Sequence, residues 1–180
     1  MRYDIEFDKN PKGGLAWGTV AVTASFLLGA VAIAANGPET AEVLGKLHQA
    51  NLKEIEMGKL AKKNGEAKEV KAYGETLVKD HTNADKKVTA LAKQEKIDLP
   101  AAKPEVDPDM AKMTGASFDT HFAKEMLDDH KRDVAEATKA RDSTTDQRLK
   151  KLLTDLVPVL AKHQDIAQKL VDAKHPSASN

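Results

Sequence analysis

The sequence predicts an all-α protein, a four-helix bundle preceded by an N-terminal hydrophobic helix. The composition is rich in Ala, Lys, Leu, Glu and Asp, and aromatic residues make up only 4% of the 180 residues. Four long segments repeat apolar residues at steps of three and four, the spacing of one helix face. Helices of similar length that each have one apolar face bury those faces best against one another.

The hydrophobic segment comprises residues 15–35, which carry no charged side chain and are long enough to cross a bilayer as a helix. Near its end, residues 32–34 read Ala-Ile-Ala, the small-residue pattern found before signal-peptide cleavage sites. We therefore expect residues 1–36 to be either a signal peptide or a single transmembrane anchor. If it is not cleaved, the segment makes the membrane a partner of this protein.

Charged residues beside this segment predict its orientation. Lys9 and Lys12 precede it, whereas Glu39 and Glu42 follow it. Positive charge tends to stay on the cytoplasmic side of a membrane. Residues 37–180 are therefore expected outside the cytoplasm, either exported to the periplasm or anchored to the membrane.

The bundle domain is expected at residues 37–174. Its helices are predicted at about residues 38–63, 66–95, 117–141 and 147–173, and residues 175–180 are predicted to be a disordered tail. Asn64-Gly65 marks a tight turn between the first two helices. Residues 96–115 contain three prolines, which exclude a continuous helix. This connection is long enough to cross the whole bundle.

Histidines interrupt the apolar faces, one on each helix. They are His48, His81, His130 and His163. His48 and His81 are equally far from the Asn64-Gly65 turn, so we expect them at one level. The level of His163 depends on whether residues 96–115 cross the bundle, but in either arrangement all four histidines fall near its middle. Facing imidazoles suit a transition-metal ion such as zinc, copper, nickel or iron.

Acidic residues accompany these candidate ligands. Asp80 and Asp129 directly precede His81 and His130. Neighbouring residues on a helix point about 100° apart, so each aspartate could orient a histidine of another helix, but not its own neighbour, by a hydrogen bond. The alternative is that both aspartates are solvated. Glu54 is a further candidate ligand, although the sequence favours a solvated position for it. The competing interpretation is that the histidines only satisfy one another within the core.

Composition excludes several function classes. Lys+Arg and Asp+Glu are both 28, so no basic surface for nucleic acid is expected. The absence of cysteine excludes disulfides, thiolate metal sites and iron–sulfur clusters. No Ser-His-Asp order and no phosphate-binding glycine loop is present. The sequence therefore favours a non-enzymatic protein without assigning a reaction.

Three segments carry a family resemblance. VKAYGETLVKDH (70–81), SFDTHFAKEMLDDH (117–130) and LVPVLAKHQ (156–164) follow a hydrophobic N-terminus. Over about residues 40–172 the chain resembles the bacterial exported family called domain of unknown function 4142, of the ferritin-like group. The resemblance implies a ferritin-like antiparallel bundle with a long crossover between the second and third helices, and no assigned activity.

The di-iron proteins of the ferritin-like group use Glu-x-x-His motifs. Val78, Leu127 and Leu160 stand three residues before the inward histidines of the last three helices, so that motif is absent. Two functions stay open. One is an exported bundle that binds a metal ion through its histidines. The other is a structural or interaction module, membrane-tethered or periplasmic, with no metal.

Overall fold

The computed structural model describes residues 38–101 and 103–174, and this part of the chain is helical without strands. Its helices are α1 (Pro38–Asn64), α2 (Lys68–Glu95), α3 (Pro108–Lys112), α4 (Gly115–Ser143) and α5 (Gln147–Lys174). The predicted all-helical bundle is confirmed, and the long helices begin and end within a few residues of the predicted bounds. The short α3, which Asp107 caps at its N-terminus, was not predicted.

The expectations for residues 1–36 and 175–180 lie outside the described residues. Among the helices that the structure describes, none combines the length and the apolar character that a membrane span requires.

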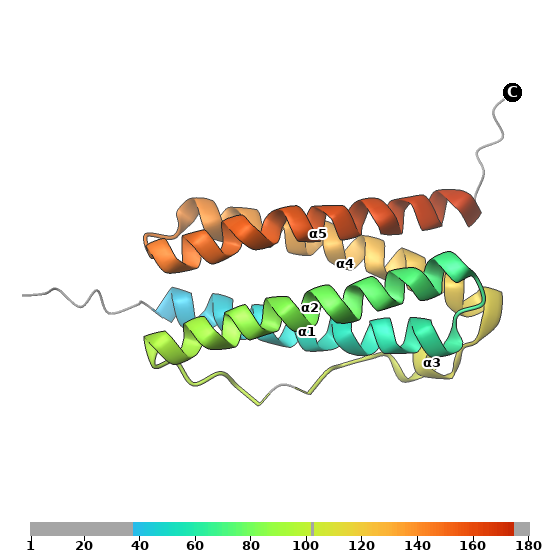
Figure 1. Cartoon of the computed structure of the whole chain (residues 1–180), viewed down its shortest axis with the longest axis horizontal. Coiled ribbons are helices and arrows are strands. Elements are labelled where there is room, and N and C mark those ends of the chain that lie inside the picture. The colour runs from blue at the N-terminus through green and yellow to red at the C-terminus, as the bar shows by residue number, and fades with distance from the viewer. Residues whose placement is uncertain (1–37, 102, 175–180) are drawn as a thin grey trace, which may run out of the picture. The chain divides into compact units, whose positions relative to one another are not determined.

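The bundle consists of two antiparallel hairpins, α1 with α2 and α4 with α5 (Figure 1). Contacts between α2 and α5 and between α1 and α4 join them. The connection from α2 to α4 runs along α1. Near the start of α1, Pro100 of the connection lies 3.7 Å from the position that a Cβ on Gly45 would take. At the other end of α1, the Asn64 amide donates to the Ala111 carbonyl at 3.2 Å. The predicted crossover is therefore present.

The first hairpin is tightly packed because glycines face each other across it. A Cβ on Gly58 would lie 2.6 Å from the carbonyl oxygen of Gly74, and a Cβ on Gly74 would lie 2.6 Å from that of Gly58. No side chain fits at such a distance. These glycines allow the backbones of α1 and α2 to approach each other and fix their relative register.

A buried carboxylate of α4 binds the backbone of the turn that precedes α2. Asp119 has no exposed surface, and its two oxygens accept hydrogen bonds from the backbone N–H groups of Glu66 and Ala67 at 3.0 and 2.9 Å. Backbone N–H groups outside the regular hydrogen bonds of a helix need another acceptor. Asp119 therefore links the second hairpin to the start of α2.

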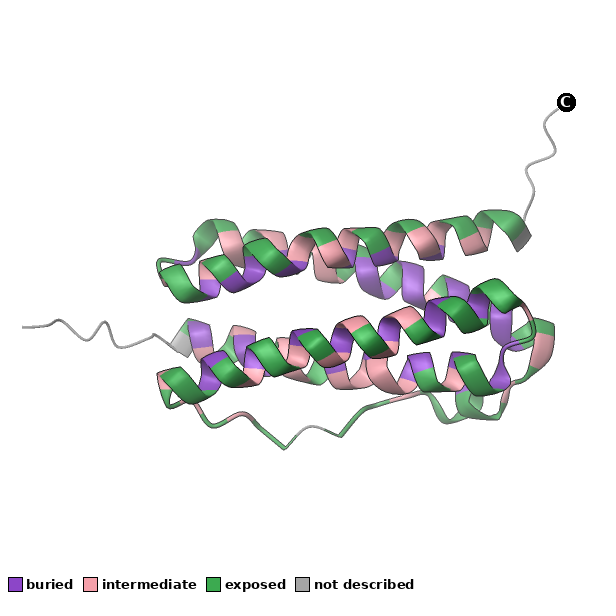
Figure 2. Cartoon of the chain, viewed as in Figure 1, coloured by how far each residue is buried: buried purple, intermediate pink, exposed green. Residues whose placement is uncertain are grey.

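The apolar core is divided into two clusters, and the buried faces of the long helices turn toward each other around them (Figure 2). The first cluster includes Leu44, Val88, Leu149, Leu153, Leu156 and Leu160. The second includes Met57, Tyr73, Leu77, Phe118, Phe122 and Met126. On each long helix the two sets are separated by one or two buried polar residues. A polar layer therefore crosses the middle of the bundle.

Candidate metal centre

Three histidines from three helices form the centre of the polar layer. His81 on α2, His130 on α4 and His163 on α5 are 3%, 0% and 0% exposed. Their ring centroids lie 5.2 to 5.7 Å apart. One ring nitrogen of each histidine lies within 4.8 Å of the others. Two nitrogens bound to one ion at about 2 Å lie roughly 3–4 Å apart, so only a small tightening separates this arrangement from ligation.

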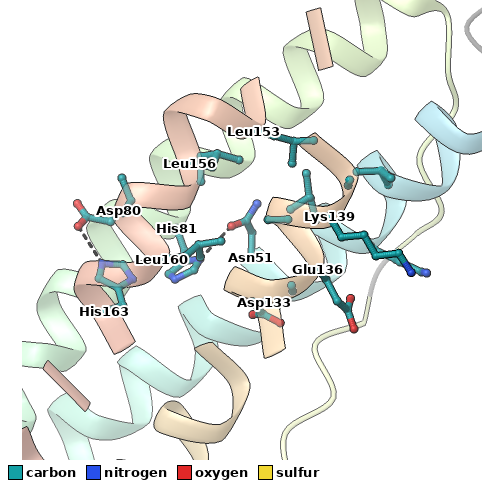
Figure 3. A pocket seen from close by; sticks show the side chains of 18 of the residues that line it. Asn51, Asp80, His81, Asp133, Glu136, Lys139, Leu153, Leu156, Leu160 and His163 are labelled. Atoms are coloured by element: carbon teal, nitrogen blue, oxygen red, sulfur yellow. Dashed lines mark hydrogen bonds and ion pairs between the residues drawn. The ribbon is translucent and has the colours of Figure 1, made fainter. Parts of the chain in front are cut away.

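Each imidazole is held through one of its two nitrogens. The Nδ1–H of His81 donates to Asn51 Oδ1 at 2.9 Å and that of His130 to the Met126 carbonyl at 2.8 Å. His163 uses Nε2–H, which donates to Asp80 Oδ2 at 3.1 Å (Figure 3). All three acceptors are oxygens, so the bonded nitrogens carry the protons.

The second nitrogen of each ring has no hydrogen-bond partner and is buried. These atoms are His81 Nε2, His130 Nε2 and His163 Nδ1. In the tautomers fixed by the bonds above, each of them presents a lone pair rather than a proton. The set therefore has the chemistry of three neutral nitrogen ligands, each with a hydrogen bond that orients its ring.

Burial keeps these imidazoles neutral. It lowers the pKa of His130 to about 4 and the pKa of His81 well below its usual value. Burial also lowers the pKa of His163, although the hydrogen bond to Asp80 acts in the opposite direction. A neutral imidazole is the form that binds metals, so no proton needs to be displaced at neutral pH.

The fourth predicted ligand, His48, is not part of this group. It is half-buried on α1, and its Nδ1 lies 2.7 Å from Asp85 Oδ1. The turn explains the difference, because α2 begins at Lys68 rather than at the predicted residue 66. The longer turn shifts the pairing by about one helical turn, so His81 faces Asn51 instead of His48.

The two aspartates have different roles. Asp80 orients His163 from another helix, as the sequence predicted. Asp129 does not bond to a histidine. Its oxygens lie 2.7 Å from Lys53 Nζ and 2.8 Å from a guanidinium nitrogen of Arg132. The prediction that Asp129 orients a ligand is therefore wrong in this structure.

The expected solvated position of Glu54 is also wrong. This side chain is 1% exposed, and its Oε2 has no hydrogen-bond partner. Burial, assisted by the nearby carboxylates of Asp129 and Asp133, raises the pKa of Glu54 well above its usual value. Glu54 lies one helical turn from Asn51 on the inward face of α1. It extends the polar layer, and its burial favours the protonated, uncharged form of the acid.

Sequence reasoning missed Asn51 as the partner of His81. A signal was available, because His48, Asn51 and Glu54 follow one another at steps of three where an apolar stripe is expected. Three polar residues in such a series indicate a polar surface that faces the core. Of the two other histidines of the chain, His121 is exposed on α4 and His175 lies outside the described residues.

Solved structures show the same fold. The structures described as CopM in the Cu(I)-bound form and CopM in the Cu(II)-bound form match with TM-scores of 0.67 and 0.66. Their sequences are 19% and 18% identical to this chain, and each match covers 76% of this chain and 97% of the other. At this level of identity the likeness concerns the fold.

A search of curated protein sequences found no match. The family resemblance that the three sequence segments suggest is confirmed over a larger span, because the model of one family, described as domain of unknown function (DUF4142), matches residues 28–170. The chain belongs to the DUF4142 family.

Proposed function

We propose that this protein binds one copper ion through His81, His130 and His163. The observation that carries the proposal is the convergence of three buried imidazole nitrogens, each without a hydrogen-bond partner. A buried polar atom left without a partner costs about 1–3 kcal/mol. One ion would satisfy all three atoms together. A purely structural core gains nothing from this arrangement, since its histidines would be expected to bond to one another.

The ligand set favours an ion of low charge. The three imidazoles are uncharged, and the hydrogen bond from His163 to Asp80 supplies only indirect negative charge. Burying an uncompensated charge is costly, so Cu(I) with one charge suits the layer better than a divalent ion. Imidazole is a common ligand of copper, zinc, iron and nickel. The shared fold with structures described as copper-bound supports copper among these.

The proposed setting is outside the cytoplasm. The uncharged segment 15–35 and the lysines before it support export or membrane anchoring of the bundle. Fractionation of cells that produce the full chain tests this part of the proposal. Recovery in the cytoplasm would contradict it.

Copper binding is tested on the full chain produced without a histidine tag. Metal is removed with a chelator, and Cu(I) and Zn²⁺ are then titrated separately in competition with a chromophoric chelator. We expect one Cu(I) per chain and weaker binding of Zn²⁺. His81→Gln and His130→Gln should each abolish this binding. Asp80→Asn, which removes the charge that orients His163, should weaken it by roughly 10–100-fold.

Matched controls come from histidines outside the group. His48→Gln and His121→Gln remove imidazoles from the same protein and should leave the Cu(I) affinity unchanged. Far-UV circular dichroism of each variant verifies that the bundle is folded. If Cu(I) fails to bind, or if the His81 and His48 variants lose it equally, the proposal is wrong and the bundle is better described as a structural or interaction module.

A further inference from the structure

A pocket of about 420 Å³ lies in the half of the bundle that contains the first core cluster. All four long helices contribute to its wall. Its inner end reaches His81 and His163, and its outer end reaches the exposed side chains of Glu136 and Lys139. Pockets for small molecules usually measure roughly 300–1,000 Å³. A bare ion does not require a space of this size.

The wall of the pocket is mainly aliphatic. Its apolar side chains include Val43, Leu47, Ala140, Leu153, Leu156 and Leu160. Several of them belong to the first core cluster. An occupant with an apolar body would therefore gain stabilisation by burial, at about 25 cal/mol per Å² of apolar surface.

Beside the free nitrogens of His81 and His163, this wall contains a buried hydrogen-bond donor that lacks a partner. Asn51 is 5% exposed and lines the pocket. Its Oδ1 accepts a hydrogen bond from His81, but its Nδ2 donates to no atom. Figure 3 shows the side chain of Asn51 beside His81, to which it is hydrogen-bonded. A buried amide donor of this kind requires an acceptor, which the occupant can provide.

The charges around the pocket argue against an anionic occupant. Its ionisable lining comprises the carboxylates Glu39, Asp80, Asp133 and Glu136 and the amines Lys46 and Lys139, beside two histidines that burial keeps neutral. The Lys46 amine already lies 2.7 Å from Glu42. A carboxylate ligand would therefore approach an excess of negative charge, which an uncharged acceptor such as a carbonyl avoids.

We propose that this pocket binds a small, uncharged, largely apolar molecule whose carbonyl oxygen accepts a hydrogen bond from Asn51 Nδ2. The inference goes beyond copper binding and does not require it, because the walls and the free donor are present in the protein without metal. His81 and His163 border both sites, so such a molecule would lie beside the metal centre.

Three related probes test the proposal on the metal-free full chain. Benzylacetone has an apolar body and one carbonyl, butylbenzene lacks the oxygen, and phenylbutyrate carries a carboxylate. Binding is followed through the methyl NMR signals of Leu153 and Leu156, which report from within the pocket. We expect saturable binding of benzylacetone, about 10-fold weaker binding of butylbenzene, and still weaker binding of phenylbutyrate.

Variants locate the binding site. Ala140→Phe fills the pocket and should abolish binding of all three probes, whereas Ala135→Phe adds the same ring at an exposed position of α4 outside the lining and should not. Asn51→Leu should bind benzylacetone no better than butylbenzene. Retained binding of butylbenzene to that variant demonstrates that its pocket is intact.

The proposal is overturned if benzylacetone does not saturate, if Ala140→Phe leaves its binding unchanged, or if phenylbutyrate binds most tightly. It is also overturned if Asn51→Leu keeps the preference for benzylacetone over butylbenzene. Because the chain is metal-free throughout, failure of the copper titration has no bearing on these outcomes.

Discussion

Replacing Glu54 should change how the stability of the protein depends on pH. Glu54 is 1% exposed, its Oε2 has no partner, and its pKa is raised well above the usual 4.5, first by burial. In the unfolded chain the same carboxyl ionises near pH 4.5. We consider Glu54→Gln and Glu54→Met, which both remove the titrating group at similar volume.

The sign follows from proton binding in the two states. Below pH 4.5 both states hold the proton and Glu54 has no pH-dependent effect. Above it, the unfolded chain releases the proton while the folded protein keeps it, so the free energy of unfolding falls with rising pH. The loss is about 1.4 kcal/mol per pH unit until the folded-state pKa of Glu54 is reached.

Urea unfolding of metal-free wild type and variants, at several pH values between about 4.5 and 7, measures this difference. The stability of both variants relative to wild type should increase with pH. A difference in free energy of unfolding between variant and wild type that is the same at every pH reflects packing and is not part of the prediction. Glu56→Gln, a change of the same atoms at a partly exposed position of α1, is the control and should show no such trend. A variant-minus-wild-type difference that stays flat across this range would refute the burial argument.

Two substitutions and one titration test the fold and the centre. Asp119→Ala leaves the backbone N–H groups of Glu66 and Ala67, in the turn before α2, without their acceptor and should cost about 2–3 kcal/mol in urea unfolding, whereas Asp128→Ala on the exposed face of α4 should cost little. Gly74→Ala should lower the melting temperature despite the better helix propensity of alanine, because the new Cβ would lie 2.6 Å from a carbonyl oxygen of α1. Gly45→Ala, whose nearest neighbour would be 3.7 Å away, should not. The imidazole of His130 should remain neutral in an NMR titration until the pH approaches 4, and protonation near pH 6.5 would contradict its burial.

Helix positions were predictable from the sequence because they depend on local periodicity. The register between helices was not, because it depends on the length and shape of the turns. Counting from Asn64-Gly65 placed His48 opposite His81, but residues 65–67 all lie in the turn, and α2 starts after them. A shift of one helical turn exchanges one inward residue for the next. Asn51 therefore takes the position that His48 was expected to fill.

The partners of the polar residues were harder to predict. On a helix, an aspartate beside a histidine can point toward either neighbouring helix or toward solvent. Asp80 and Asp129 occupy equivalent places in the sequence, yet Asp80 bonds to His163 and Asp129 bonds to Lys53. The difference depends on which long side chain reaches the carboxylate from across the interface. Sequence periodicity contains no information on that choice.

The polar layer makes sense as a site rather than as part of the core. Apolar side chains of similar size at His81, His130, His163 and Glu54 would join the two clusters into one continuous core and would remove four of the buried polar atoms that lack a partner. Each of these residues instead is desolvated, and burial shifts its pKa in the direction that favours the uncharged form. Such a layer lowers the stability of the empty bundle, and a ligand that binds only the folded state offsets that loss. The interruption of the core therefore argues for binding at this level of the bundle.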